Sequence, residues 1–178
     1  MNKKRCHWVT NDEIYIKYHD EEWSVPTYDD RLLFEMLILE SFQAGLSWIT
    51  ILKKRENFKK AFDEFDVLKV AEYDDEKITE LLDNDGIIRH KGKITSAINN
   101  ARIFIEIQKE FGSFSDYIWS FTDGEIIKAD FKTESDLSEE ISKDLKKRGM
   151  KFVGPTIIYS YLESIGIIDN HEKDCYKY

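Results

Sequence analysis

The hydrophobic pattern singles out one stretch of the chain, residues 35–54. An almost wholly apolar run leads to a lone carboxylate, Glu40, and a helix that is apolar on all sides is a buried helix. A turn through Gly45 follows, and Trp48 comes directly after it. Because a buried carboxylate is costly unless it has a partner or a task, Glu40 and Trp48 together predict a pocket for a flat, polar ring, whether neutral or cationic. A solvated glutamate and a core tryptophan are the alternative, which spacing alone does not exclude.

Helical periodicity extends over most of the chain, whereas strand-like alternation is scarce. Tyr15, Tyr18 and His19 have helical spacing near the N-terminus. Further helices are expected over residues 31–42, 49–62, 66–71, 75–82, 94–111, 117–121, 138–148 and 156–165. Only two prolines and eight glycines interrupt the pattern, and residues 122–137 are expected to form a loop. We therefore predict an all-α fold, a single compact helical domain over residues 1–178.

A short basic segment joins two of these helices, within an element of about residues 75–111. Residues 84–93 read NDGIIRHKGK and carry no acid after Asp85. The candidate contacts for a phosphate are Gly86, Arg89, Lys91, Gly92 and Lys93. Glycine amides and the first turn of a helix can receive a phosphate, so this segment predicts phosphate binding. A plain solvated turn with basic residues is the alternative.

Four candidate metal ligands stand near the two ends of the chain: Cys6, His19, His171 and Cys175. Two thiolates and two imidazoles match tetrahedral zinc, and a site with four protein ligands is closed and structural. The spacing of the last two ligands would place both on one helical face. Such an ion would join the N-terminal segment to the C-terminal tail without doing chemistry. Two free cysteines and two surface histidines are the alternative.

Composition narrows the class of protein. The 178 residues carry a formal net charge of −9, so we expect no bulk attraction to nucleic acid, although a local basic patch is not excluded. A hydrophobic content of 42% describes a globular protein. The chain has no run of about 18 apolar residues, and its N-terminus lacks the apolar stretch of a secretory signal. We expect no membrane span, a cytoplasmic location, and a monomer without an obligate protein partner.

Several stretches taken together resemble one family. These stretches are CHWVTNDEIYIKYHDEEWSVP, LESFQAGLSWITILKKRENF, GIIRHKGKI, SKDLKKRGMKFVGPTI and the terminal HEKDC. They look like the DNA-3-methyladenine glycosylase I family, in the family's order and from about Cys6 to Cys175. The resemblance implies a helical fold of the helix-hairpin-helix DNA glycosylase superfamily with a structural zinc ion (Zn²⁺).

The resemblance also assigns roles to residues. It places the zinc ligands at the four positions named above, and the base pocket at Glu40, Tyr18, Tyr15, Trp48 and Trp8. It implies that the segment from Gly86 to Lys93 docks the DNA backbone. The turn at Gly45 and Leu46 is expected to enter the gap that an extruded base leaves. Two residues depart from the family pattern: Ser24 stands where glycine is usual, and Phe42 stands where a polar residue is common.

The implied activity is hydrolysis of the N-glycosidic bond of 3-methyladenine in alkylated double-stranded DNA, a step of base excision repair. The base would flip into the pocket, Glu40 would favour its positive form, and water would leave an abasic site without strand cleavage. Asp116, downstream of the hairpin, is a second candidate for catalysis that the sequence does not exclude. The alternatives are a non-catalytic zinc-containing DNA-binding module and a zinc hydrolase, which needs an open metal position.

Overall fold

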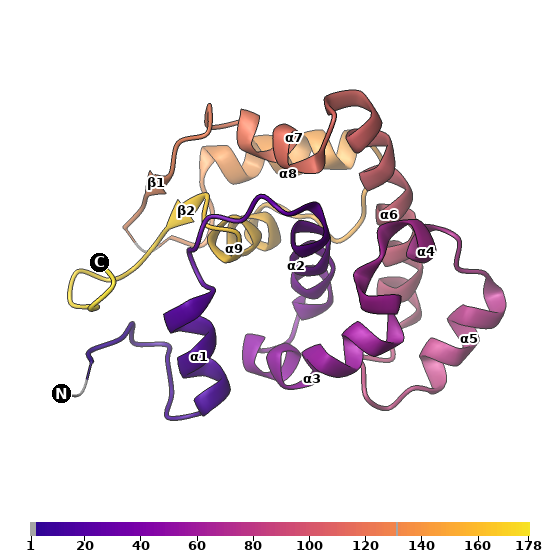
Figure 1. The fold of residues 1–178 in the computed structure, drawn as a ribbon, viewed down its shortest axis with the longest axis horizontal. Helices are drawn as coiled ribbons and strands as arrows, with labels where there is room; N and C mark the ends of the chain where they lie inside the picture. Colours follow the sequence, from indigo (N-terminus) through magenta and orange to yellow (C-terminus); the bar gives the residue numbers. More distant parts are fainter. Residues whose placement is uncertain (1–2, 131) are drawn as a thin grey trace.

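The computed structural model describes residues 3–130 and 132–178, and it confirms the prediction of an all-α fold (Figure 1). The helices are α1 (Glu13–Glu21), α2 (Asp30–Gln43), α3 (Trp48–Ala61), α4 (Val67–Ala71), α5 (Asp75–Asp83), α6 (Lys91–Phe111), α7 (Phe114–Ser120), α8 (Asp136–Lys147) and α9 (Pro155–Ser164). A 3₁₀ turn, Asp63–Phe65, follows α3. Two short strands, β1 (Ile127–Lys128) and β2 (Ile168–Asp169), pair in parallel.

The central element is α2, as its apolar run predicts (Figure 1). Every residue from Leu33 to Phe42 is buried, and the helix contacts α3, α6, α7 and α9. Its two buried acids differ. Glu35 accepts a hydrogen bond from Arg55 Nε of α3 at 2.7 Å, which is how buried charges are usually held. Glu40, one turn further on, has no ion pair with any residue that the structure describes.

Local capping explains where several helices begin. Asp66 and Asp74 accept hydrogen bonds from backbone N–H groups in the first turns of α4 and α5. The expected start of α8 at Ser138 is wrong by two residues. Ser135 caps this helix instead, because Ser135 and Ser138 form a reciprocal capping box in which the second serine lies inside the first turn.

The chain after α9 is held tightly and carries residues back toward α1. Gly166 has a φ of +79°, and a Cβ at this position would lie 2.3 Å from the backbone nitrogen of Pro26. Only glycine suits such a close approach in the left-handed region. β2 follows and pairs with β1, so that Ile168 lies opposite Ile127. This path of the chain places Asn170 and His171 beside the N-terminal segment. Both chain ends lie on one side of the molecule (Figure 1).

The basic segment lies between α5 and α6, as predicted. Gly86 packs against α3, where its Cβ would meet Asn57 Cγ at 3.1 Å. His90 caps α6, and its Nδ1 accepts a hydrogen bond from the Lys93 backbone N–H at 3.1 Å. α5 and α6 therefore contact each other across a short connection that is anchored at both ends. None of the described helices is both long and apolar enough to cross a membrane.

Candidate active site

A cavity of about 260 Å³ lies between α1, α2, α3 and α9. Its walls are mainly aromatic, with two carboxylates and a few amides and hydroxyls. The lining residues are Trp8, Tyr15, Tyr18, Trp23, Glu40, Gln43, Trp48, Lys132, Thr133, Thr156, Tyr159, Ser160, Glu163 and Asn170. The structure thus brings together all five residues predicted for a base pocket. An apolar hollow with a few convergent polar groups is the usual form of a small-ligand site.

Glu40 is the buried acid of this cavity, with only 3% of its surface exposed. Burial, and after it the nearby Glu163, raises the pKa of Glu40 well above its usual range. None of the described residues donates a hydrogen bond to its carboxyl group. A carboxyl group that is costly to ionise and lacks a donor is satisfied by a ligand that supplies hydrogen bonds or positive charge.

The aromatic side chains form a continuous wall around that acid. Tyr18 and Trp48 lie with their ring centroids 5.5 Å apart, and Trp8 contacts Tyr15 at 5.2 Å. Trp48 Nε1 is buried and has no hydrogen-bond partner among the described residues. Burial and then the charge of Glu40 raise the pKa of Tyr18, so its hydroxyl stays a donor. Flat rings bind well between such side chains.

The opposite wall of the cavity, which α9 and the segment after β2 provide, was not predicted from the sequence. Glu163 lines the cavity and accepts a hydrogen bond from Asn170 Nδ2 at 2.7 Å. Burial raises the pKa of Glu163 to about 7, while the Asn170 hydrogen bond opposes this shift. The signal was present in the sequence: Glu163 is a lone acid in an apolar helix, which is the pattern that singled out Glu40.

The turn between α2 and α3 presents Leu46 to solvent. Gly45 adopts a φ of +78° with open space where a Cβ would stand, so its role is conformational. The Gln43 side chain donates to the Leu46 carbonyl at 2.7 Å, and the Leu46 N–H donates to the Gln43 carbonyl at the same distance. This double clamp holds an apolar side chain, 36% exposed, next to the cavity wall.

Lys93 was predicted to contact a phosphate of DNA, and the structure corrects this prediction. Its side chain is buried, and Nζ donates to the carbonyls of Phe42 at 2.8 Å and Ala44 at 2.6 Å. Lys93 therefore ties the first turn of α6 to the end of α2 and to the Gly45 turn. Arg89 and Lys91 are exposed instead, and Gly92 is partly exposed. These three residues remain available to DNA.

We expect Lys93→Met to lower the free energy of unfolding by about 2–6 kcal/mol, because it leaves two carbonyls without a donor at about 1–3 kcal/mol each. Urea denaturation measures this change. Lys91→Met is the matched control, since Lys91 is exposed and forms no ion pair with a described residue. Equal stability of the two variants would contradict the structural role of Lys93.

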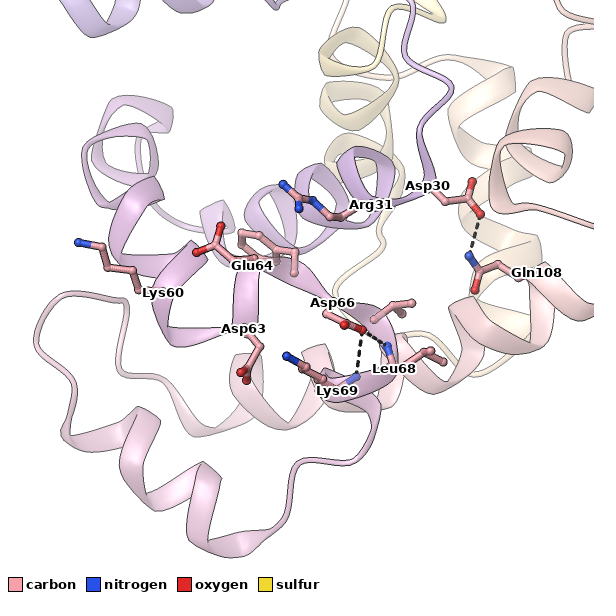
Figure 2. A pocket seen from close by; sticks show the side chains of 11 residues that line it. Asp30, Arg31, Lys60, Asp63, Glu64, Asp66, Leu68, Lys69 and Gln108 are labelled. Atoms are coloured by element: carbon pink, nitrogen blue, oxygen red, sulfur yellow. Dashed lines mark hydrogen bonds between the residues drawn. The ribbon is translucent and has the colours of Figure 1, made fainter.

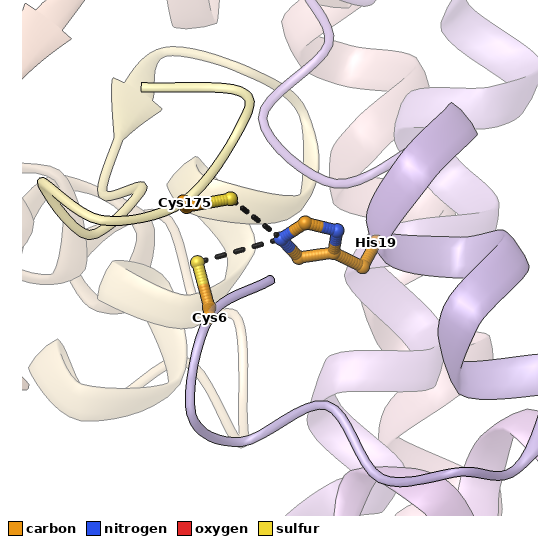
Figure 3. A group of neighbouring side chains, drawn as sticks. All are labelled: Cys6, His19 and Cys175. Atoms are coloured by element: carbon orange, nitrogen blue, oxygen red, sulfur yellow. Dashed lines mark hydrogen bonds between the residues drawn. The ribbon is translucent and has the colours of Figure 1, made fainter. Parts of the chain in front are cut away.

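Cys6, His19 and Cys175 form the core of the predicted metal site (Figure 3). His19 Nε2 lies 3.4 Å from each of the two sulfur atoms, and the three candidate ligand atoms are within 4.8 Å of one another. The group could therefore hold a metal ion. Burial raises the pKa of the Cys6 thiol to about 12 and lowers the pKa of His19, so the imidazole is in its neutral, metal-binding form.

His171 stands at the edge of this group. Its ring centroid lies 5.2 Å from that of His19, and its buried Nε2 has no partner among the described residues. Asp169 binds the other nitrogen of His171 at 2.7 Å, and Asp20 binds Nδ1 of His19 at 2.9 Å. Metal-bound histidines are held in this way, with Nε2 left for the ion. The donors therefore suit zinc, although the tail forms turns and the expected helical face of His171 and Cys175 is wrong.

A larger hollow, of about 790 Å³, lies between α2, α4 and α6 (Figure 2). Its acids already have structural roles. Asp30 accepts hydrogen bonds from the Gln108 side chain and from two backbone N–H groups of α7, and Asp66 caps α4. The residues from Asp63 to Phe65 all have positive φ, which shapes the turn into α4. This hollow holds none of the predicted site residues.

The aromatic cavity with its two acids, next to the Cys/His group, has the lining of a site for a small flat ligand. Comparison with known proteins is more specific. The chain belongs to the methyladenine glycosylase family, whose model matches residues 8–178, and the resemblance seen in the sequence is thereby confirmed.

The most informative relatives are similar over almost their whole length. DNA-3-methyladenine glycosylase 1 of Escherichia coli (strain K12) is 45% identical, over 97% of this chain and 95% of its own. A Haemophilus influenzae DNA-3-methyladenine glycosylase is 43% identical, with 96% of each chain covered. A crystal structure of a 3-methyladenine DNA glycosylase I has a TM-score of 0.94 at 46% identity, over 97% of this chain and 98% of its own. The Staphylococcus aureus enzyme, solved to explain 3-methyladenine recognition, has a TM-score of 0.93 at 39% identity, covering 97% and 95%.

Proposed function

We propose that this protein is a DNA repair enzyme that hydrolyses the N-glycosidic bond of 3-methyladenine in alkylated double-stranded DNA. The observation that carries the proposal is the aromatic cavity, in which a buried acid without a partner among the described residues lies beside the rings of Tyr18 and Trp48. The family of the chain, and the relatives named for this activity, support the same reaction. The cavity alone would suit any flat ring with positive charge or hydrogen-bond donors.

The base must leave the duplex before it can enter a cavity of this kind, because a stacked base is out of reach. Leu46, which is exposed at the tip of a clamped turn beside the cavity, would fill the vacated stack. Arg89 and Lys91, together with the first turn of α6, would hold the phosphates on the neighbouring surface. These DNA contacts form one surface in the proposal, with Gly86 and Gly92 shaping the hairpin.

Methylation at N3 makes the adenine cationic in the nucleotide, so the glycosidic bond is already weakened. Trp48 and Tyr18 would stack on the ring, and an attractive cation–aromatic contact contributes about 0.5–2 kcal/mol. Glu40 would accept hydrogen bonds from the base and stabilise its positive charge, with Tyr15 and Trp8 completing the wall. The base leaves with the electron pair of the bond, water adds to C1′, and the water's second proton passes to solvent.

The metal group takes no part in this reaction in our proposal. Cys6, His19, His171 and Cys175 would hold a structural Zn²⁺ that joins the two ends of the chain. Trp8 supports this view, because its ring lies 5.4 Å from that of His19 and also lines the cavity. The ion would thereby keep the N-terminal wall of the cavity in place.

The experiment is release of free 3-methyladenine from alkylated duplex DNA, measured by chromatography and mass spectrometry. We expect release by the wild-type protein, with the abasic strand left uncut. Lys132 is the lysine among the cavity-lining residues, and no covalent adduct is expected when borohydride is added. Binding to the DNA without release would instead favour a non-catalytic DNA-binding module. The single domain, the monomeric state and the cytoplasmic location stay predictions.

A further inference from the structure

The cavity contains a second carboxylate, Glu163, that the mechanism above does not use. It lies on α9, whereas Glu40 lies on α2, and both line the same cavity. Its position is fixed, because Oε1 accepts a hydrogen bond from Asn170 Nδ2 at 2.7 Å and Asn170 is only 2% exposed. An acid held this firmly at the wall of a small cavity is part of the ligand-binding surface.

The same wall presents a buried polar atom that lacks a partner within the described chain. Asn170 Oδ1 forms no hydrogen bond there, and Asn170 lines the cavity. Buried polar groups in native proteins nearly always have a partner. This atom, beside the Glu163 carboxylate, therefore points to a ligand that offers hydrogen-bond donors to the α9 wall.

The charges that surround Glu163 favour a cationic ligand. Glu40 faces it from α2 and Tyr18 faces it from α1, while Tyr159 shares its helix. Lys132 is the basic residue among the cavity-lining side chains, and it is exposed. Burial raises the pKa of Glu163 to about 7, and burial followed by the nearby Glu163 raises the pKa of Glu40, so the two carboxylates do not both ionise easily. A bound cation removes the repulsion between them, whereas a neutral ring of the same outline does not.

We propose that Glu163, positioned by Asn170, is a second carboxylate of the base site and makes the site select a positively charged base over a neutral base of the same shape. This inference rests on the proposed function, because it concerns the base that the cavity receives. Glu40 and Glu163 then contact the cation from opposite walls, and the charge of the base becomes a criterion of recognition in addition to its outline.

The test compares two duplexes. One carries 3-methyladenine, which is cationic in the nucleotide, and the other carries 3-methyl-3-deazaadenine, which has the same outline without the charge. We expect Glu163→Gln to slow single-turnover release of 3-methyladenine about 10-fold, the size of one lost charge contact in a partly buried site. Its affinity for the neutral duplex should stay within about twofold of wild type, which a general distortion of the cavity would not allow. Glu140→Gln is the matched control, because Glu140 is exposed on α8 and the change in net charge is the same.

A double variant gives a sharper test. Glu163→Gln combined with Asn170→Asp exchanges the two groups, so the hydrogen bond is kept and one carboxylate remains at this wall. We expect the exchange to restore the preference for the cationic base, with zinc content checked because residue 170 precedes His171. Unchanged release of 3-methyladenine by Glu163→Gln, or an equal loss of affinity for both duplexes, would overturn the inference while leaving the glycosylase function standing. Failure of the wild-type protein to release 3-methyladenine would overturn both.

Discussion

Glu40→Gln is expected to slow the release of 3-methyladenine from alkylated duplex DNA by about 10²-fold, with normal folding and zinc content. This size is at the low end of losses seen when one preorganised polar group is removed from an active site. The substitution keeps the shape of the side chain and removes its ability to carry negative charge. Because the base is cationic before the bond breaks, the loss should appear in the affinity for DNA that contains 3-methyladenine as well as in the rate of release, whereas the affinity for undamaged DNA should not change.

The structure explains why this single atom exchange matters. Glu40 is buried at the end of α2 without an ion pair to a described residue, so a bound cation would be its main counter-charge. Gln would instead present an amide N–H₂ group to that cation. Glu35 shows the contrast, since its charge is already matched by Arg55 at 2.7 Å and is held inside the core.

Asp116→Asn is the matched control for this prediction. Asp116 is exposed in the first turn of α7 and is not among the residues that line the cavity. We expect the Asp116→Asn protein to release 3-methyladenine at a rate within about twofold of wild type, as for surface changes away from a site. A loss of about 10³-fold in the Asp116 variant with normal folding, or an unaffected Glu40→Gln enzyme, would place the chemistry outside the cavity.

The second large effect is expected when a proposed metal ligand is removed. Cys175→Ser is expected to abolish stoichiometric zinc and to lower the free energy of unfolding by about 4 kcal/mol, well below the 10–16 kcal/mol of zinc-finger peptides because α2 has its own core. For a domain of this size, that loss corresponds to a drop in Tm of about 8–16 °C. Release of 3-methyladenine should fall as well, since Trp8 and Tyr18 lie next to the ligands.

Metal analysis by mass spectrometry and thermal unfolding measure this effect. His90→Asn is the control, because His90 caps α6 away from the two chain ends and asparagine caps helices equally well. The control should keep both its zinc and its Tm. A Cys175→Ser protein with full zinc occupancy would contradict the proposed ligand set, and a protein without zinc but with unchanged Tm would contradict its structural role.

The features that the sequence predicted are those encoded locally. Apolar residues cover every face of α2, so the helix is buried on all sides and Glu40 is buried with it. Asp66 and Asp74 act within one helical turn, so their capping could be recognised directly. The two cysteines and two histidines are the exception, because they lie at opposite ends of the chain and were grouped only because few ligand sets suit a tetrahedral ion.

The features that the sequence did not predict depend on contacts between distant elements. Lys93 belongs to a basic segment, yet it is buried because the end of α2 lies against α6 and offers it two carbonyls. Glu163 meets Asn170 only because Gly166 turns the chain back after α9. The C-terminal tail brings His171 and Cys175 together through turns. The spacing of these two residues in the sequence is compatible with turns as well as with a helix.

The central claim is that the cavity between α1, α2, α3 and α9 holds the methylated base. A crystal structure of the protein with 3-methyladenine tests it most directly. We predict that the base stacks on Trp48 and that its edge lies within hydrogen-bonding distance of Glu40. A base bound in the hollow between α2, α4 and α6, or at the surface with the cavity filled by solvent, would contradict the account.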